Sequence, residues 1–346
     1  MQNISEHQFI ILGLGSIGKH HAEFLSSYKG ELVCIDPNIA ARNWIQDNFE
    51  LDKAMAFSSL QEAEEQILLS PLKKIGVISN WGTQHFQSIL DFKGLNIKNL
   101  YVEKPIANSL SALNSIKDMT DQLNLIGGFQ YRYIDIIERV HQISLDELGG
   151  LPTMMTVNGG AAGMVTNGVH FLDLSISIFG ADPLSVVSNL SSSNINPRSK
   201  ELDFWEGLAS WEFSDNRHLT INFTNQSSVE RTAEIFCPKG KIKINEDMSL
   251  DIFQRSESEI LADNRIIRLG TVTQKNSNSI EPNNDQLFSR IFFPLLQDDK
   301  DGFNIDRELS ATKAMIYALI ASKTERKVSL LEKPEESWYE YEWQIS

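Results

Sequence analysis

The sequence predicts two domains: an α/β domain with a doubly wound parallel sheet, followed by an α+β domain. Three observations support this prediction. The chain has 346 residues, which is too long for one ordinary domain. Strand-like apolar runs alternate with helix-like segments up to about residue 128. Beyond that point the alternation stops, and several strand-like runs follow one another. We therefore predict a first domain over residues 1–128 and a second over 129–346.

The composition excludes several classes of function. The chain is 41% hydrophobic and 22% charged, as in soluble globular proteins. Its net charge is −15 and its 31 basic residues form no cluster, which argues against nucleic acid and anionic membranes as partners. No apolar run reaches the roughly 18 residues that span a bilayer, and we see no signal peptide. Cys34 and Cys237 lie far apart in strand-like runs, so we expect reduced thiols in a cytoplasmic protein.

The first predicted strand ends in a glycine-rich loop. The run QFIILGLG, residues 8–15, is apolar and rich in β-branched side chains, as in a strand buried on both faces. A helix is predicted over 16–28. Gly13, Gly15 and Gly18 have the spacing G-x-G-x-x-G across this junction. In a dinucleotide-binding loop these glycines permit a tight turn, close approach of the backbone to pyrophosphate, and close packing of helix on strand.

The next strand, predicted over 31–36, ends in Asp36. A carboxylate about 20 residues after the loop can accept hydrogen bonds from the ribose diol, and it repels a 2′-phosphate. Arg42 is poorly placed to offset that repulsion, so we predict NAD rather than NADP. The backbone of Ser16 and Ile17, at the start of the helix, is expected to face the phosphates. The adjacent His20 and His21 do not share a helix face, so we predict no metal site there.

The alternation continues through the rest of the first domain. Strands are predicted over 73–80, 98–105 and 124–131, and helices over 83–93 and 109–123. In a doubly wound sheet the functional side chains lie at the carboxyl ends of the strands. Those ends are marked here by Asn80, Trp81, Glu103, Lys104 and Pro105. Partial burial and a neighbouring cationic nicotinamide would both disfavour an ammonium group, so Lys104 suits proton transfer better than a solvated surface role. Pro105 fixes the turn and permits a cis bond.

The second domain begins with a helix predicted over 132–148. Strands are then predicted over 153–160, 208–214, 218–224, 232–238 and 241–245. Their alternating apolar residues indicate one face covered by helices and the other free for a partner subunit. A helix over 167–180 interrupts the strands and places His170 and Asp173 on one face.

These motifs resemble the Gfo/Idh/MocA oxidoreductases, the relatives of glucose-fructose oxidoreductase and inositol dehydrogenase. The segments that carry the resemblance are the glycine loop with Asp36, SNWGTQH at 79–85, EKP at 103–105, GVHFLDL at 168–174 and the closing segment 308–330. The resemblance implies a Rossmann domain followed by an α+β domain with a large, mostly antiparallel sheet. It also implies a homodimer or homotetramer formed through the open face of that sheet.

The resemblance implies roles for individual residues. Lys104 is expected as general base, and His170 is expected to orient the substrate hydroxyl or share its proton. Asp173 would orient His170 or line the site, and Arg132 would bind an anionic group or form a structural ion pair. Thr166 and Asn167 are the remaining candidates for substrate binding. The candidate cofactor-binding residues are Gly13, Gly15, Ser16, Ile17, Gly18, Asp36, Asn80, Trp81, His85, Glu103 and Lys104.

Two positions depart from the family pattern. Thr166 stands where many members have an aspartate four residues before the histidine, and threonine cannot take a proton at neutral pH. Trp81 stands in place of a proline, and its indole would pack either on a ligand or within the loop.

The expected function is NAD-dependent hydride transfer at a carbinol carbon of a sugar, cyclitol or sugar derivative. The substrate could be nucleotide-linked, as in surface-polysaccharide pathways. Two alternatives stay open at this point. One is redox-neutral cleavage of glycosides with retained NAD. The other is a non-catalytic NAD-binding sensor, which Thr166 in the aspartate position keeps open and which Lys104 and His170 argue against.

Overall fold

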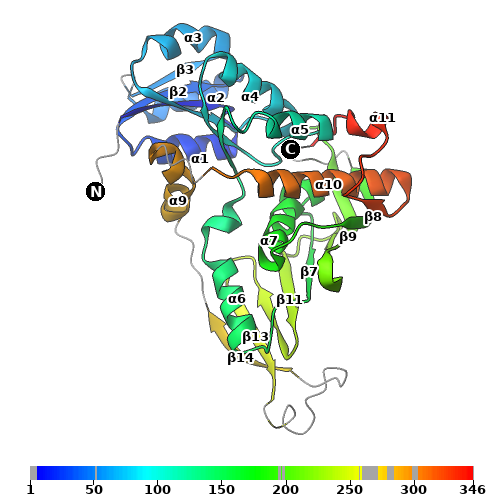
Figure 1. Ribbon diagram of the computed structural model, residues 1–346. Coiled ribbons are helices and arrows are strands. Elements are labelled where there is room, and N and C mark those ends of the chain that lie inside the picture. The colour runs from blue at the N-terminus through cyan, green and yellow to red at the C-terminus, as the bar shows by residue number, and fades with distance from the viewer. Residues whose placement is uncertain are drawn as a thin grey trace. The chain divides into compact units, whose positions relative to one another are not determined.

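The computed structural model describes residues 6–50, 53–193, 196, 199–256, 258, 272–278, 284–297 and 303–345. The chain forms two compact units (Figure 1). Unit 1 comprises Met1–Phe129, Asn284–Leu309 and Glu340–Ser346, and unit 2 comprises Gln130–Asn283 and Ser310–Tyr339.

Unit 1 is built on a parallel sheet of six strands in the order β3-β2-β1-β4-β5-β6. The strands are β1 (His7–Leu12), β2 (Gly30–Ile35), β3 (Ala54–Phe57), β4 (Lys73–Ile78), β5 (Asn99–Val102) and β6 (Asn124–Gly127). Leu12 at the end of β1 is in register with Ile35 and Ile78 at the ends of β2 and β4. This is the doubly wound order of a dinucleotide-binding fold, in which the topology reverses between β1 and β4. The predicted Rossmann sheet is confirmed.

Helices connect these parallel strands. They are α1 (Ser16–Leu25), α2 (Ile39–Asn48), α3 (Leu60–Leu69), α4 (His85–Gly94) and α5 (Leu110–Lys117), with a short 3₁₀ turn, η1 (Gly82–Gln84), before α4. Side-chain caps mark several helix starts: Asn38 accepts a hydrogen bond from Ala40, and Ser109 accepts one from Ala112. The pair α2–β3 and the helix α3 have no separate counterpart among the predicted elements.

Two segments from the far end of the chain belong to unit 1. The helix α9 (Asn284–Gln297) packs Phe288 and Phe292 against Phe24 of α1, with ring centroids 5.3 and 6.0 Å apart. Near the C-terminus, the backbone N–H of Trp343 donates to the Asn108 carbonyl at 2.9 Å. The sequence prediction assigned residues 284–309 and 340–346 to the second domain. The structure places them in unit 1, because these contacts join residues distant along the chain.

Unit 2 contains a nine-stranded sheet in the order β14-β13-β12-β11-β7-β10-β9-β8-β15. The strands are β7 (Met154–Gly159), β8 (Ser185–Ser193), β9 (Phe204–Glu212), β10 (His218–Phe223), β11 (Thr232–Cys237), β12 (Gly240–Ile244), β13 (Leu250–Arg255), β14 (Val272–Asn278) and β15 (Val328–Ser329). Of the strand pairs that the structure describes in this sheet, β7 with β10 is parallel and the others are antiparallel. The prediction of a large, mostly antiparallel sheet is confirmed.

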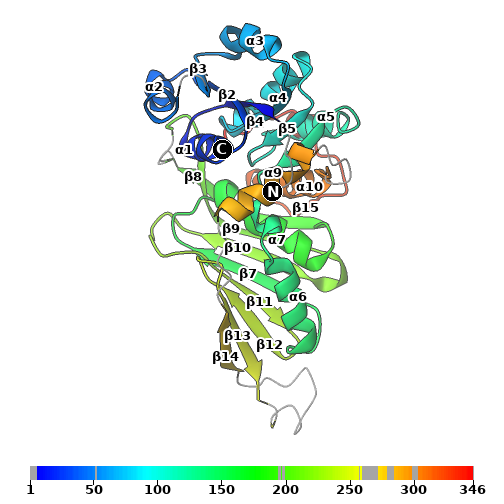
Figure 2. The same ribbon diagram turned by 90° about the vertical axis from the view of Figure 1, so that its left-hand side faces the viewer.

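Helices lie along one face of this sheet, as Figure 2 shows for α6 and α7. They are α6 (Ile136–Asp146), α7 (Val169–Phe179) and, from Ser310 onward, α10 (Asp306–Thr324). Trp211 of β9 is fully buried and donates its indole N–H to the Ala314 carbonyl of α10 at 3.1 Å. On alternate positions the strands carry half-buried polar side chains, among them Ser210 and Thr220, whose hydroxyls are 3.1 Å apart. One face of the sheet is therefore apolar and the other is mixed.

Both cysteines are free thiols: Cys34 is buried in β2 and Cys237 is half-buried in β11. In the part of the chain that the structure describes, no helix is long and apolar enough to cross a membrane.

Candidate active site

The glycine loop joins β1 to α1, and its three glycines have different surroundings. Gly13 has a φ of +96°, and a Cβ atom there would lie 2.5 Å from the Asn80 nitrogen. At Gly18 a Cβ atom would lie 2.0 Å from the Gly13 carbonyl oxygen. At Gly15, which is exposed, a Cβ atom would meet nothing within 4 Å. Two glycines therefore permit the turn and the helix packing, and the third leaves open space at the start of α1.

That open space lies at the N-terminus of α1. Gly15 occupies the N-cap position and offers no side-chain cap, and Ser16 beside it is exposed while Ile17 is half-buried. The first N–H groups of a helix have no partner within the helix and carry partial positive charge. The junction thus has the donors, the charge and the room that a pyrophosphate group needs.

Asp36 lies directly after β2 and is tied to the glycine loop. Its carboxylate accepts hydrogen bonds from the backbone N–H groups of Leu14, at 2.7 Å, and Asn38, at 2.8 Å. Arg42 donates to the carbonyl oxygens of Asp36 and Pro37 at 2.7 and 2.8 Å. The guanidinium group therefore braces the backbone of this turn, while the carboxylate remains the anionic group beside the loop.

The loops after β4 and β5 are held together by His85. Its buried ring lies between two carbonyl oxygens, with Nδ1 2.8 Å from Pro105 O and Nε2 3.1 Å from Asn80 O. Burial lowers the pKa of His85, and the contacts with the Pro105 and Asn80 carbonyl oxygens partly offset this effect. The ring is enclosed and connects the two loops. The structure therefore gives no support to the sequence prediction that His85 contacts the cofactor. The Lys104–Pro105 peptide bond is cis.

Trp81 and Lys104 project from these same two loops. Trp81 is 40% exposed. At Gly82, next to it, a Cβ atom would lie 2.9 Å from the Ile345 oxygen and 3.2 Å from Pro105. Lys104 is half-buried. The backbone beneath both side chains is therefore closely packed, and the partly exposed indole leaves both predicted roles of Trp81 open.

Glu103 is buried and its carboxylate faces inward. Oε1 lies 3.1 Å from Nε2 of His21 and accepts a hydrogen bond from the Tyr101 hydroxyl at 2.6 Å, and Oε2 accepts one from the Lys104 N–H at 3.3 Å. Burial alone would raise its pKa, but the hydrogen bond to His21, the charge of His21, the charge of Lys104 and the hydrogen bond from Tyr101 together outweigh burial and lower the pKa to about 2. Glu103 is therefore a buried anion rather than an exposed ligand for a cofactor.

In unit 2, His170 lies in the first turn of α7, at the end of a π-helical turn, η3 (Met164–Gly168). Its side chain is buried, and its ring lies 5.3 Å from that of Tyr131, centroid to centroid. Thr166 lies within the π-turn and is half-buried. Such turns are rare and occur frequently at functional sites.

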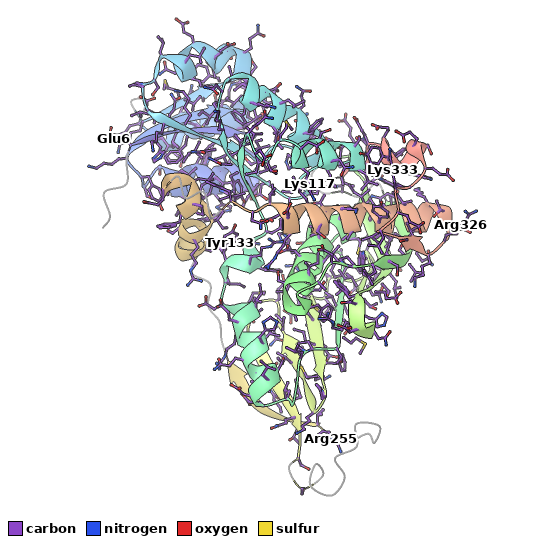
Figure 3. The ribbon with its side chains drawn as sticks, in the orientation of Figure 1. Glu6, Lys117, Tyr133, Arg255, Arg326 and Lys333 are labelled. Carbon is purple, nitrogen blue, oxygen red and sulfur yellow. The ribbon has the colours of Figure 1, made fainter. Side chains whose placement is uncertain are left out.

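Arg132 and Asp173 form an ion pair inside unit 2. Arg132 belongs to η2 (Gln130–Tyr133), the turn that precedes α6 and that Tyr133 marks in Figure 3. Its Nε lies 2.8 Å from both oxygens of Asp173, and a second guanidinium nitrogen is also bonded to this carboxylate. The carboxylate is fully buried. Of the two predicted roles of Arg132, the structure has the structural ion pair.

Asn167 takes part in a second polar cluster of unit 2. Its Oδ1 accepts a hydrogen bond from Arg231 at 2.5 Å, and its amide nitrogen donates to the Ala162 carbonyl. Arg231 is also paired with Glu246, through Nε at 2.8 Å and a second guanidinium nitrogen. The charge of Arg231 lowers the pKa of Tyr131 and that of Glu246 raises it, but burial has the largest effect, and the pKa is raised.

Sequence reasoning missed five of these residues. They are His21, Tyr101, Tyr131, Arg231 and Glu246. The histidine was singled out only as half of an adjacent pair, and its partner Glu103 is 82 residues away. No local pattern marks such pairings. Among the described residues, no group of three or more His, Cys, Asp or Glu side chains could hold a metal ion.

A family comparison identifies part of unit 2. Residues 156–253 match the model of the oxidoreductase family, C-terminal alpha/beta domain, which carries the name Gfo/Idh/MocA. The resemblance to these oxidoreductases is thereby confirmed. No curated protein matches the sequence.

Solved structures share the whole fold. An NAD-binding protein from Listeria innocua is 17% identical, with a TM-score of 0.71 over 94% of this chain and 99% of its own. GenD2 from gentamicin A biosynthesis, solved with NAD, is 14% identical, with a TM-score of 0.73 over 95% and 97%. Scyllo-inositol dehydrogenase from Lactobacillus casei, solved with NAD(H) and scyllo-inositol, is 16% identical, with a TM-score of 0.66 over 94% and 100%. At these identities the likeness establishes the fold.

Proposed function

We propose that the protein is an NAD-dependent oxidoreductase that transfers hydride between nicotinamide and a carbinol carbon of a sugar, cyclitol or sugar derivative. The observation that carries the proposal is the glycine loop of unit 1. Exposed Gly15 leaves room beside the first N–H groups of α1, whereas a Cβ atom at Gly13 or Gly18 would collide with the backbone. The oxidoreductase domain matched in unit 2, and the structural neighbours solved with NAD, support the same proposal.

The residues of unit 1 have distinct tasks in this proposal. The N-terminus of α1 binds the pyrophosphate, and Asp36 accepts hydrogen bonds from the adenine ribose and repels a 2′-phosphate. NAD, when bound, supplies the hydride acceptor. The amine of Lys104 takes the proton of the substrate hydroxyl as the carbinol carbon is oxidised.

In unit 2, we assign His170 to orienting the substrate hydroxyl. Thr166 can donate a hydrogen bond to a hydroxyl but cannot take its proton at neutral pH, so the proton falls to Lys104. Because Arg132 is paired with Asp173, its charge is already compensated within unit 2 and is less suited to bind an anionic substrate group. This favours an uncharged polyol over a sugar acid within the proposed substrate class.

The proposal is tested by the absorbance of NADH at 340 nm. Purified protein is incubated with NAD, or separately NADP, and a panel of sugars, inositols, sugar acids and nucleotide sugars. The variant Lys104→Met removes the base, and Lys117→Met, an exposed lysine near the end of α5 that Figure 3 labels, is the matched control. We expect NADH from one group of polyols, a loss of at least about 10²-fold in Lys104→Met, and no loss in Lys117→Met.

If the wild-type protein formed no NADH with any compound of the panel, the proposal would be contradicted. Cleavage of an aryl glycoside without net NADH would then identify the redox-neutral glycosidase. Binding of NAD with neither reaction would identify a sensor.

We include self-association in the proposal. The face of the nine-stranded sheet that carries Ser210 and Thr220 is the surface through which a homodimer or homotetramer would form. Light scattering of the protein as it elutes from a size-exclusion column measures the mass of the assembly directly. A mass of about one chain of 39.1 kDa at micromolar concentration would contradict this part of the proposal.

A further inference from the structure

His21 is a buried titratable side chain that the proposed reaction does not use. It lies on α1, the helix that begins at the glycine loop, and none of its surface is exposed. Its Nε2 is 3.1 Å from Oε1 of Glu103, the residue directly before Lys104. This contact joins the helix of the glycine loop to the loop that carries the proposed base. The two residues are 82 positions apart in the sequence.

Aromatic rings enclose this contact. The His21 ring meets Tyr101, Phe288 and Phe292 edge to face, with centroids 4.8, 5.2 and 5.6 Å away. The two phenylalanines come from α9, which Figure 1 shows beside α1. A carboxylate in such surroundings is costly unless hydrogen bonds compensate for the loss of water. The hydrogen bonds that the Glu103 carboxylate accepts therefore decide whether it stays ionised and how it is oriented.

Both oxygens of the Glu103 carboxylate accept hydrogen bonds. Oε1 accepts them from the Tyr101 hydroxyl and the His21 ring, and Oε2 accepts one from the backbone N–H of Lys104. A Cβ atom at Gly128 would lie 2.8 Å from Oε2, so the backbone closes over this side of the group. Among the described residues, Nδ1 of His21 has no hydrogen-bond partner. The ring therefore donates to the carboxylate through Nε2.

We propose that His21 is a positioning residue for the reaction: it holds the Glu103 carboxylate in the orientation that fixes the backbone of Lys104. The inference rests on the proposed function, in which Lys104 is the base. Without the His21 donor, the buried carboxylate takes up a proton or turns away, and the Lys104 N–H loses its acceptor. The hydrogen bond also sets the loop of the base against the helix that binds pyrophosphate.

The test compares two substitutions of His21 that separate its donor from its ring. His21→Phe keeps a ring within the aromatic cluster and deletes the donor, and His21→Gln keeps an N–H at about the position of Nε2. In His21→Phe we expect kcat to fall about tenfold to a hundredfold, the range for a small displacement of a reacting group. We expect the KM for NAD to change by less than about twofold, since the glycine loop is untouched. His21→Gln should recover most of kcat.

The pH profile gives a readout that general loss of structure would not produce. The titratable groups that act on Glu103 are His21, Lys104 and Tyr101, and the charge of Glu103 in turn acts on His85. An ammonium group holds its proton more tightly beside a carboxylate than beside a carboxylic acid. The rising limb of kcat/KM should therefore move to lower pH in His21→Phe and return in His21→Gln.

An NMR titration of the ¹³C-labelled Glu103 carboxyl separates this inference from the proposed function. The full-length protein should show an ionised Glu103 at pH 5, and His21→Phe should show its pKa raised. An unchanged titration in folded His21→Phe, or an unchanged kcat and pH profile, would overturn the inference. An inactive wild-type protein with the expected titration would overturn the function instead. If His21→Phe does not fold, Tyr101→Phe deletes the other donor to Oε1 and should shift the titration in the same direction.

Discussion

Gly18 lies so close to Gly13 that a Cβ atom at position 18 would be 2.0 Å from the Gly13 carbonyl oxygen. This contact packs α1 onto the end of β1 and orients the first turn of the helix. Gly15, between them in the sequence, has nothing within 4 Å of its Cβ position. The same motif therefore contains positions constrained by the protein itself and one position with open space.

Gly18→Ala should destabilise unit 1. The contact at 2.0 Å is with backbone, which cannot rotate away, so we expect a loss of about 1–3 kcal/mol in the free energy of unfolding. Gly15→Ala is the matched control and should unfold close to wild type, since its φ of −66° is open to alanine. Thermal and urea unfolding measure both variants. Equal stability of the two would contradict the packing described here.

Asp36 should control the choice between NAD and NADP. Asp36→Ala removes an anionic acceptor of hydrogen bonds, which is worth about 1.5–3 kcal/mol and corresponds to at least about a tenfold loss of NAD affinity. NADP affinity should rise relative to NAD, because repulsion of the 2′-phosphate is relieved. Asp36→Asn retains an acceptor for the Leu14 N–H and separates this effect from disorder of the loop. Calorimetric titration with both nucleotides measures the ratio, and an unchanged ratio would rule out the assigned role.

Arg132 and Asp173 should behave as a structural pair. Arg132→Met leaves a buried carboxylate without its partner, at a cost of about 3–5 kcal/mol. The double variant Arg132→Met with Asp173→Leu removes both charges and should recover most of that stability. Unfolding measurements on the single and double variants give the coupling energy. If the double variant is stable but loses affinity for the substrate found by the panel, Arg132 binds substrate after all.

Acid should destabilise unit 1 through Glu103. Its folded pKa of about 2 lies below the ordinary value of 4.5, so its contribution is complete above pH 4.5 and is lost as pH falls toward 2. Wild type should therefore lose more stability than Glu103→Gln between about pH 5 and about pH 3. Thermal unfolding at a series of pH values tests this. Parallel curves for the two proteins would show that Glu103 is not the group responsible.

The sequence predicts five of the six strands of unit 1, because each of those five contains an apolar run that ends in a turn; the short strand β3 was not predicted. The spacing of Gly13, Gly15 and Gly18 likewise reports local backbone geometry, which needs no distant partner. Strands such as β8 and β13 were missed: β8 carries many serines, and β13 ends in Gln254 and Arg255 after only three apolar residues, so neither forms a plain apolar run.

The pairing of site residues is less accessible from sequence. Arg132 and Asp173 are 41 positions apart, and the sequence left both a substrate role and an ion pair open for Arg132. Glu103 has the type and position of a cofactor ligand, yet His21 and Tyr101 turn it inward. These outcomes depend on contacts between distant segments, which a motif does not encode. The same reason explains why the return of α9 to unit 1 was not predicted.

The central claim is that the glycine loop binds NAD at the N-terminus of α1. The most direct measurement is a calorimetric titration of the wild-type protein and Gly15→Ala with NAD. We predict binding of one NAD per chain to wild type, and affinity at least about tenfold weaker in the variant, because the new methyl group takes the space that pyrophosphate needs. Absence of NAD binding by wild type, or equal affinity of the two proteins, would contradict the claim.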